Sequence, residues 1–117
     1  MDKQDCVLCN LRNRHKGGEE GIRVVYETEH VLAIHATKPF AEVHILILSK
    51  KHIPSMLDLT ENDTELVADV CKAIRIASEE VFALKGACKL EMNTGKFPKF
   101  TAVGHFHCHV IYDSSLD

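Results

Sequence analysis

Short apolar runs bounded by polar residues make up most of the chain. Residues 22–27 and 31–36 are two such runs, and the short polar link between them predicts a β-hairpin. Residues 43–49 form the clearest strand, because apolar and β-branched residues fill the run and Lys50-Lys51 bounds it. Residues 88–93 and the segment that starts at His105 predict two further strands, whereas the polar, glycine-rich residues 14–21 predict a loop.

A long helical period occurs once in the sequence. Thr60 is a good N-cap, and Glu61 and Asp63 place negative charge in the first turn. Apolar residues then recur at steps of three and four, which predicts a helix from about Glu61 to Leu84 that ends at Gly86. The apolar stripe consists of Leu66, Val67, Val70, Ile74, Ala77, Val81 and Phe82.

The order of these elements defines the expected fold class. With a single long helix, most of the strands cannot be joined by helical crossovers. We therefore expect an α+β fold, in which an antiparallel sheet carries the helix on one face. The length of 117 residues is that of a single domain, residues 1–117.

Composition narrows the function classes. Apolar residues make up 45% of the chain and the net charge is −3, without a dominant basic patch, which argues against nucleic acid as a partner. The polar start of the chain is not followed by the apolar core of a signal peptide, and no run approaches the length of a membrane span. We expect a cytoplasmic protein without membrane contact.

Residues 105–111, His-Phe-His-Cys-His-Val-Ile, are the most informative stretch. Successive side chains of a strand point to opposite faces, so the three imidazoles would share one face and Phe106, Cys108 and Val110 the other. Three imidazoles on one face can bind an anion, hold a metal or attack an electrophile.

The cysteines suggest a second kind of chemistry. Cys6 and Cys9 form a Cys-x-x-Cys pair, which in a reducing compartment indicates metal or redox work more often than a disulfide. Cys71 and Cys88 are interpreted as small buried residues, and Cys108 as a core residue by alternation.

Together these residues resemble the histidine triad (HIT) family. The His105-Phe106-His107-Cys108-His109 strand matches the His-x-His-x-His pattern followed by two apolar residues. Supporting features lie in family order along nearly the whole chain: Cys6-Val7-Leu8-Cys9, residues 31–34, Pro39, residues 44–52 with Lys50-Lys51-His52, and the turn Asn93-Thr94-Gly95. The resemblance implies a HIT-like five-stranded antiparallel sheet with one long helix on one face.

The resemblance also implies an activity. Members of the family hydrolyse or transfer nucleotides at the α-phosphate of substrates such as nucleoside phosphoramidates and dinucleoside polyphosphates. His107 would be the nucleophile that forms a nucleotidyl-histidine, as the chemistry of a neutral imidazole allows. His109, Asn93 and Thr101 would contact the phosphate or the leaving group, and Val7, Leu8 and Ile34 would line the nucleoside pocket. For these three aliphatic residues, plain core packing is an equal alternative.

Similar members with a Cys-x-x-Cys pair bind a structural zinc ion. The residues carried over are Cys6, Cys9, His52 and His105, a set of ligands that zinc accepts. A redox pair, a pair without metal and His44 as the fourth ligand are alternatives. The resemblance further implies a homodimer.

Two departures from the family pattern bear on activity. Ala36 occupies the place of an acidic residue that binds the ribose, and residues 100–104 lack the Gly-Gln-Ser that usually precedes the triad. A non-catalytic nucleotide-binding module that keeps the fold and the zinc is therefore the alternative hypothesis. His35 or Thr37 could replace the missing acidic residue.

Overall fold

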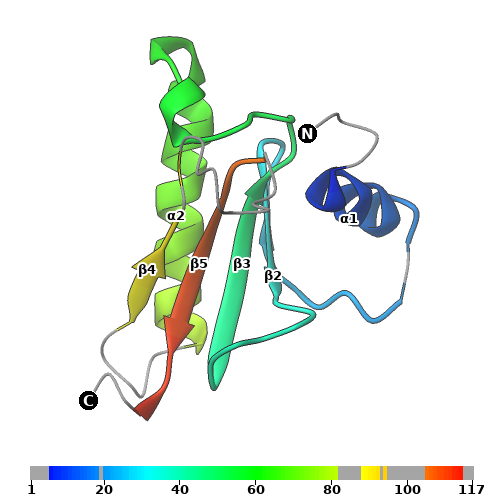
Figure 1. Cartoon of the computed structure of the whole chain (residues 1–117), viewed down its shortest axis with the longest axis vertical. Helices are drawn as coiled ribbons and strands as arrows, with labels where there is room; N and C mark the ends of the chain where they lie inside the picture. The colour runs from blue at the N-terminus through cyan, green and yellow to red at the C-terminus, as the bar shows by residue number, and fades with distance from the viewer. Residues whose placement is uncertain (1–5, 19, 82–87, 93, 95–104, 115–117) are drawn as a thin grey trace.

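The structure of the protein is a computed structural model that describes residues 6–18, 20–81, 88–92, 94 and 105–114 (Figure 1). The expected residues Asn93 and Thr101 and the expected helix end at Gly86 lie outside these ranges. Within the described ranges, no helix is long and apolar enough to cross a bilayer.

Five antiparallel strands form one sheet, as the sequence predicted. The strands are β1 (Val24–Glu27), β2 (Val31–His35), β3 (Val43–Ser49), β4 (Lys89–Glu91) and β5 (His107–Tyr112), in the spatial order β1-β2-β3-β5-β4. The central pair is β3 with β5, and its register places Leu48 opposite His107 and Leu46 opposite His109. This register brings the chain's last strand beside its middle one.

Helix α2 (Thr64–Val81) covers one face of the sheet (Figure 1). The two short 3-10 turns η2 (Met56–Asp58) and η3 (Glu61–Asp63) precede it. Thr60 caps η3 rather than α2 directly, and its side chain and that of Asp63 form a reciprocal capping box. Leu66, Val70, Ala73 and Ala77 of α2 pack in one cluster with Phe106 and with inward residues of β2, β3 and β5, among them Cys108 and Val110. The expected alternation of the histidine strand is thus confirmed. Val67, which was expected in the apolar stripe, is instead exposed.

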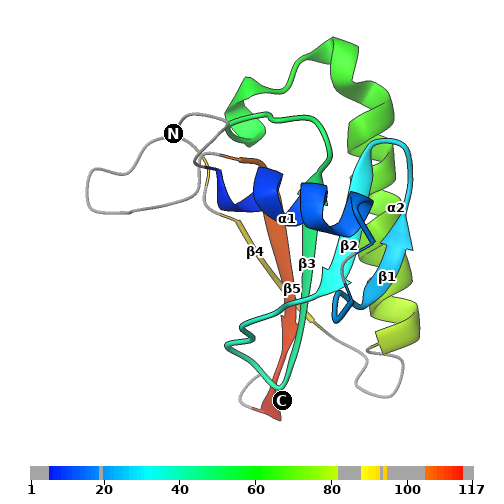
Figure 2. The same ribbon diagram turned by 90° about the vertical axis from the view of Figure 1, so that its right-hand side faces the viewer.

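A second helix, α1 (Val7–Lys16), packs on the opposite face of the sheet (Figure 2). The sequence-based loop at residues 14–21 was therefore wrong for Arg14, His15 and Lys16, which form the last turn of α1. The expected single helix on one face was also incomplete. Leu8 and Leu11 of α1 are buried against Leu32, Ile34 and Leu48 of the sheet, so the sheet has a core on both faces.

Two cysteines were misplaced by the sequence analysis. Cys71 is exposed on α2 and Cys88 is half-buried before β4, although both were expected to be buried. Cys71 follows Val70, a core residue, and the 100° step between helix neighbours turns it away from the sheet. Cys108 is buried as expected, and burial raises the pKa of its thiol to about 11.

Candidate active site and metal centre

The second face of the sheet carries the candidate site. His107 and His109 alternate with core residues on β5, so both lie on the face opposite α2. His44 of β3 is the register partner of Ile111 and lies on the same face. Helix α1 covers this face over β2 and part of β3, and the two triad histidines on β5 remain half-buried rather than sealed.

Four side chains converge where α1 meets the start of β5. The ligand atoms of Cys6, Cys9, His52 and His105 all lie within 4.8 Å of one another. Cys6 and Cys9 are brought together by the first turn of α1, whose N-cap is Cys6: its Sγ accepts a hydrogen bond from the Cys9 backbone N–H at 3.3 Å. The sequence-predicted ligand set is therefore close enough to hold a metal ion.

Three separations between the donor atoms are close to those of a tetrahedral metal site. Bonds of about 2.3 Å to sulfur and about 2.0 Å to nitrogen place neighbouring ligand atoms about 3.5 Å apart. His105 Nδ1 lies 3.3 Å from Cys6 Sγ and 3.4 Å from Cys9 Sγ, and His52 Nδ1 lies 3.0 Å from Cys9 Sγ. Two sulfurs and two imidazole nitrogens in this arrangement fit zinc.

His105 is held in the orientation that a ligand requires. Its Nε2–H donates to the Ser49 carbonyl oxygen at 2.7 Å, which leaves Nδ1 unprotonated and turned toward the cysteines. Burial lowers the pKa of His105 to about 4, and the Ser49 carbonyl opposes that shift only in part. The imidazole is therefore neutral at pH 7, as metal coordination demands.

His107 is oriented by the residue that precedes it on the same face. Its Nδ1 lies 2.7 Å from the His105 carbonyl oxygen, an acceptor, so Nδ1 carries the proton and donates. In the neutral imidazole the lone pair is then on Nε2. This nitrogen is the one free to attack an electrophile.

His44 and His109 form a hydrogen-bonded pair that the sequence analysis did not anticipate. The Phe40 backbone N–H donates to His44 Nδ1 at 3.3 Å, so the proton of a neutral His44 is on Nε2. His44 Nε2–H donates in turn to His109 Nδ1 at 2.8 Å. The proton of His109 is therefore on Nε2, and His109 can act as a hydrogen-bond donor beside His107, whose ring centroid is 5.1 Å away.

Burial controls the charge of this pair. It lowers the pKa of His109 to about 4, helped by His107 and His44, and it lowers the pKa of His44 as well. Glu91 of β4, the register partner of His109, acts in the opposite direction on both groups. Both imidazoles are neutral at pH 7, and His44 belongs to this pair rather than to the metal cluster.

The structure describes the side chains of two of the three residues that were expected to line a nucleoside pocket. Leu8 and Ile34 are buried in the apolar cluster beneath α1, which is the packing role that the sequence left open. The side chain of Val7 is outside the described part of the structure. Leu46 is half-buried on the same face opposite His109 and was missed, because its position depends on the register of β3 with β5.

The structure also describes His35 and Ala36, which lie at the position expected to bind a ribose. His35 is the register partner of Ile45, a residue of the α2-side core, so it lies on the face opposite the triad. Ala36, the next residue, donates its backbone N–H to the His44 carbonyl oxygen at 2.9 Å. His35 is therefore poorly placed to replace the missing acidic side chain.

Comparison with known proteins agrees with this fold. The family model described as "Scavenger mRNA decapping enzyme C-term binding" matches residues 5–116. An uncharacterized HIT-like protein of Mycobacterium tuberculosis is 34% identical over 108 residues, covering 91% of this chain and 69% of that protein. A HIT family hydrolase from Clostridium thermocellum has a similar structure, with a TM-score of 0.78 and 28% identity over 97% of this chain and 95% of that one. The adenosine 5'-monophosphoramidase HINT3 of Xenopus tropicalis is 22% identical over 112 residues, covering 94% of this chain and 69% of that protein.

The class of protein is defined by a triad strand paired with the middle strand of a five-stranded antiparallel sheet, and by a family model that matches nearly the whole chain. The chain belongs to this family and is a histidine triad protein.

Proposed function

We propose that the protein cleaves a nucleoside phosphoramidate or a dinucleoside polyphosphate at the α-phosphate, by hydrolysis or by nucleotidyl transfer. The observation that carries this proposal is the orientation of His107. Because Nδ1 donates to the His105 carbonyl oxygen at 2.7 Å, the Nε2 lone pair is available on the open side of the sheet. A fixed neutral imidazole is a good nucleophile near pH 7.

The reaction would proceed in two displacements. His107 Nε2 attacks phosphorus, a P–N bond forms, and the bond from phosphorus to the leaving amine or phosphate breaks as that group takes up a proton. Water then attacks the nucleotidyl-histidine, the P–N bond to His107 breaks, and the lone pair returns to Nε2 while water loses a proton. The covalent intermediate divides one difficult displacement into two easier ones.

His109 would stabilise the charge on the phosphate oxygens. Its Nε2 carries a proton because His44 donates to its Nδ1. A neutral donor aimed at a non-bridging oxygen stabilises the charge that develops during the displacement without needing to lose its own proton. Asn93 and Thr101 remain proposed as further donors to the phosphate or leaving group.

The nucleoside would rest beside α1. Val7 remains a proposed apolar contact, and the half-buried Leu46 adds a second one. Leu8 and Ile34 are buried and would support this surface from the cluster beneath α1. These side chains could hold a base by shape but offer no hydrogen bonds that select one. Ala36 leaves ribose recognition without a carboxylate.

Cys6, Cys9, His52 and His105 would hold a structural zinc ion. When bound, the ion would join α1 to the start of β5 and contribute to folding free energy. A set of four protein ligands leaves no open position for a substrate, so His107 remains the reacting group. His105 would serve both functions, since its imidazole binds the ion and its carbonyl oxygen orients His107.

The relatives support the enzyme class. HINT3 is named as a phosphoramidase, and the structurally similar chain from Clostridium thermocellum is named as a hydrolase.

We further propose that the protein is cytoplasmic and forms a homodimer. Val67 of α2 and Leu90 of β4 are both exposed apolar residues, and Leu90 lies on the α2 side of the sheet as the register partner of Val110. Sedimentation of a Leu90→Glu variant as a monomer would support this assembly, and an unchanged mass would oppose it.

The proposed activity is tested by AMP release. Purified protein is mixed with adenosine 5'-phosphoramidate and, separately, with a diadenosine polyphosphate, beside a His107→Ala control. Release that disappears in the control is the expected result and ranks the two substrate classes. Nucleotide binding without release from either substrate would instead support the non-catalytic binding module.

A further inference from the structure

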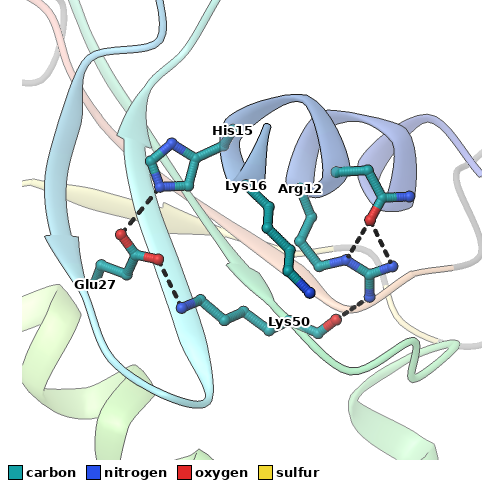
Figure 3. Close-up of a pocket in the computed structure, with 6 residues that line it drawn as sticks. Arg12, His15, Lys16, Glu27 and Lys50 are labelled. Atoms are coloured by element: carbon teal, nitrogen blue, oxygen red, sulfur yellow. Dashed lines mark hydrogen bonds and ion pairs between the residues drawn. The ribbon is translucent and has the colours of Figure 1, made fainter. Parts of the chain in front are cut away.

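A cavity of about 610 Å³ lies between the C-terminal half of α1, β1 and the residue that follows β3 (Figure 3). Its volume is within the range of pockets that hold small molecules. None of the lining residues that the structure describes belongs to the metal cluster or the triad. They are Arg12, Asn13, His15, Lys16, Glu27 and Lys50.

Glu27 is the one carboxylate among these lining residues, and it is already paired. One oxygen lies 2.6 Å from the Lys50 ammonium, and the other lies 3.0 Å from His15 Nε2. The hydrogen bond from Lys50, followed by that from His15, lowers the pKa of Glu27. The carboxylate is therefore ionised at neutral pH, and its charge offsets that of Lys50.

Among the described residues, no carboxylate pairs with the positive charge of Arg12 or Lys16. The Arg12 guanidinium donates to the Lys50 carbonyl oxygen and, at 3.3 and 3.2 Å, to Asn13 Oδ1, all of which are neutral acceptors. Within the described residues, Lys16 has no ion pair or hydrogen bond from its ammonium. The two cations are four residues apart on one helix, where like charges repel.

The helix dipole explains only part of this arrangement. Basic residues are favourable in the last turn of a helix, which accounts for Lys16 but not for Arg12, which precedes the last turn of α1. It does not account for their direction. Figure 3 shows the side chains of Arg12 and Lys16 both extending from α1 toward Lys50. In a chain of net charge −3, this is a local concentration of positive charge.

We propose that this cavity binds a small inorganic phosphate anion of the size of pyrophosphate, held by Arg12 and Lys16. The Lys16 ammonium offers three donors, and the guanidinium keeps N–H groups beyond those used by Asn13 and Lys50. Hydrogen bonds between such cations and phosphate oxygens are charge-assisted and stronger than neutral ones. The site is separate from His107 and does not depend on the reaction proposed there.

The test is a titration of the 117-residue protein with inorganic pyrophosphate, followed by NMR and by calorimetry. The backbone amides of residues 12–16, Glu27 and Lys50 should shift, while the imidazole resonances of His107 and His109 should stay in place. Affinity should fall as salt is added, because the contacts are electrostatic. Shifts centred on His107 and His109, or no binding, would overturn the proposal.

Matched variants make the test specific. Lys16→Gln removes an exposed side chain and should weaken binding roughly tenfold or more, the effect of one charge-assisted hydrogen bond. Arg14→Gln removes the same charge from the same helix but not from the cavity lining, so it should leave the affinity unchanged. Equal losses in the two variants would reduce the effect to non-specific attraction and would contradict the site.

Discussion

Glu91 is the charged residue that stands opposite His109 across the β4–β5 pair. Directly opposed residues of an antiparallel pair have Cβ atoms about 4.5–5.5 Å apart, which places the carboxylate within electrostatic reach of the imidazole. Its charge favours the protonated forms of His109 and His44, whereas burial favours the neutral forms and prevails. Glu91 therefore limits how far the pKa values of the two histidines fall.

A Glu91→Gln variant should lower the pKa values of His109 and His44 further. The amide keeps the shape of the side chain but loses the negative charge that stabilises an imidazolium. NMR titration of the imidazole resonances measures the effect directly. Lys89→Gln is the control, because Lys89 lies on the same strand but opposes Ile111. Unchanged or raised pKa values in the Glu91 variant would exclude this electrostatic role.

At the residue scale, the sequence predicted on which face of the sheet a side chain lies, but not the residues with which it interacts. The alternation of His105 to His109 with apolar residues was sufficient to predict which side chains face the core. The bond between His44 and His109 could not be predicted, since it joins residues 65 positions apart through the β3–β5 register. The roles of Ser49 and Glu91 depend on strand pairing in the same way.

At the scale of elements, α1 is attached to the sheet in two ways. Leu8 and Leu11 bury apolar surface against β2 and β3, and Cys6 and Cys9 reach the imidazoles of His52 and His105. The helix has only ten residues, too few to be stable in isolation. Its position therefore depends on these tertiary contacts, and on the metal ion when one is bound.

A Cys6→Ser variant should lose stoichiometric zinc and melt at a lower temperature than the wild type. Serine is a poor zinc ligand, and three remaining ligands bind the ion much more weakly. A chelator should lower the melting temperature of the wild type toward that of the variant. Cys71→Ser, at an exposed position on α2, should change neither metal content nor melting temperature. Retained zinc in the Cys6 variant would refute the ligand assignment.

The missed helix α1 shows where sequence patterns fail for elements. Its apolar residues are few, and its N-cap is Cys6, a residue type outside the usual capping set. The tertiary contacts of Leu8, Leu11 and the cysteines stabilise it instead. One signal was present: Arg14, His15 and Lys16 followed by Gly17 is the composition expected at a helix C-terminus. The strands and α2 were predictable because their apolar periods are long and regular.

At the scale of the molecule, the larger hydrophobic core and the candidate catalytic histidines lie on opposite faces of the sheet. The α2 face carries the larger apolar cluster, whereas the other face, on which α1 lies (Figure 2), combines the smaller cluster with the histidines. Because α1 covers only part of this second face, His107 and His109 keep partial access to solvent. The five-stranded antiparallel fold class was confirmed, while the division of the second face followed only from the structure.

Acid should destabilise the folded protein through His109. Burial lowers its pKa to about 4 in the folded state, compared with an ordinary value of 6.5. Between these two values the unfolded chain binds a proton that the folded chain does not, so stability falls as pH falls from about 6.5 toward 4. Melting temperatures of the wild type and of His109→Gln should differ in their pH dependence, with the smaller decline in the variant. A decline of equal size in both proteins would contradict this assignment.

The central claim is that His107 becomes covalently bound to the nucleotide. The most direct measurement mixes the wild-type protein with radiolabelled adenosine 5'-phosphoramidate, quenches the reaction in alkali within milliseconds, and locates any adduct by peptide mass spectrometry. Alkali is needed because the P–N bond to an imidazole is labile in acid. We predict an adenylyl group on His107 that is absent from His107→Ala and still forms in Cys71→Ser. Turnover by the wild type with label on another residue, or continued turnover by His107→Ala, would contradict the proposed mechanism.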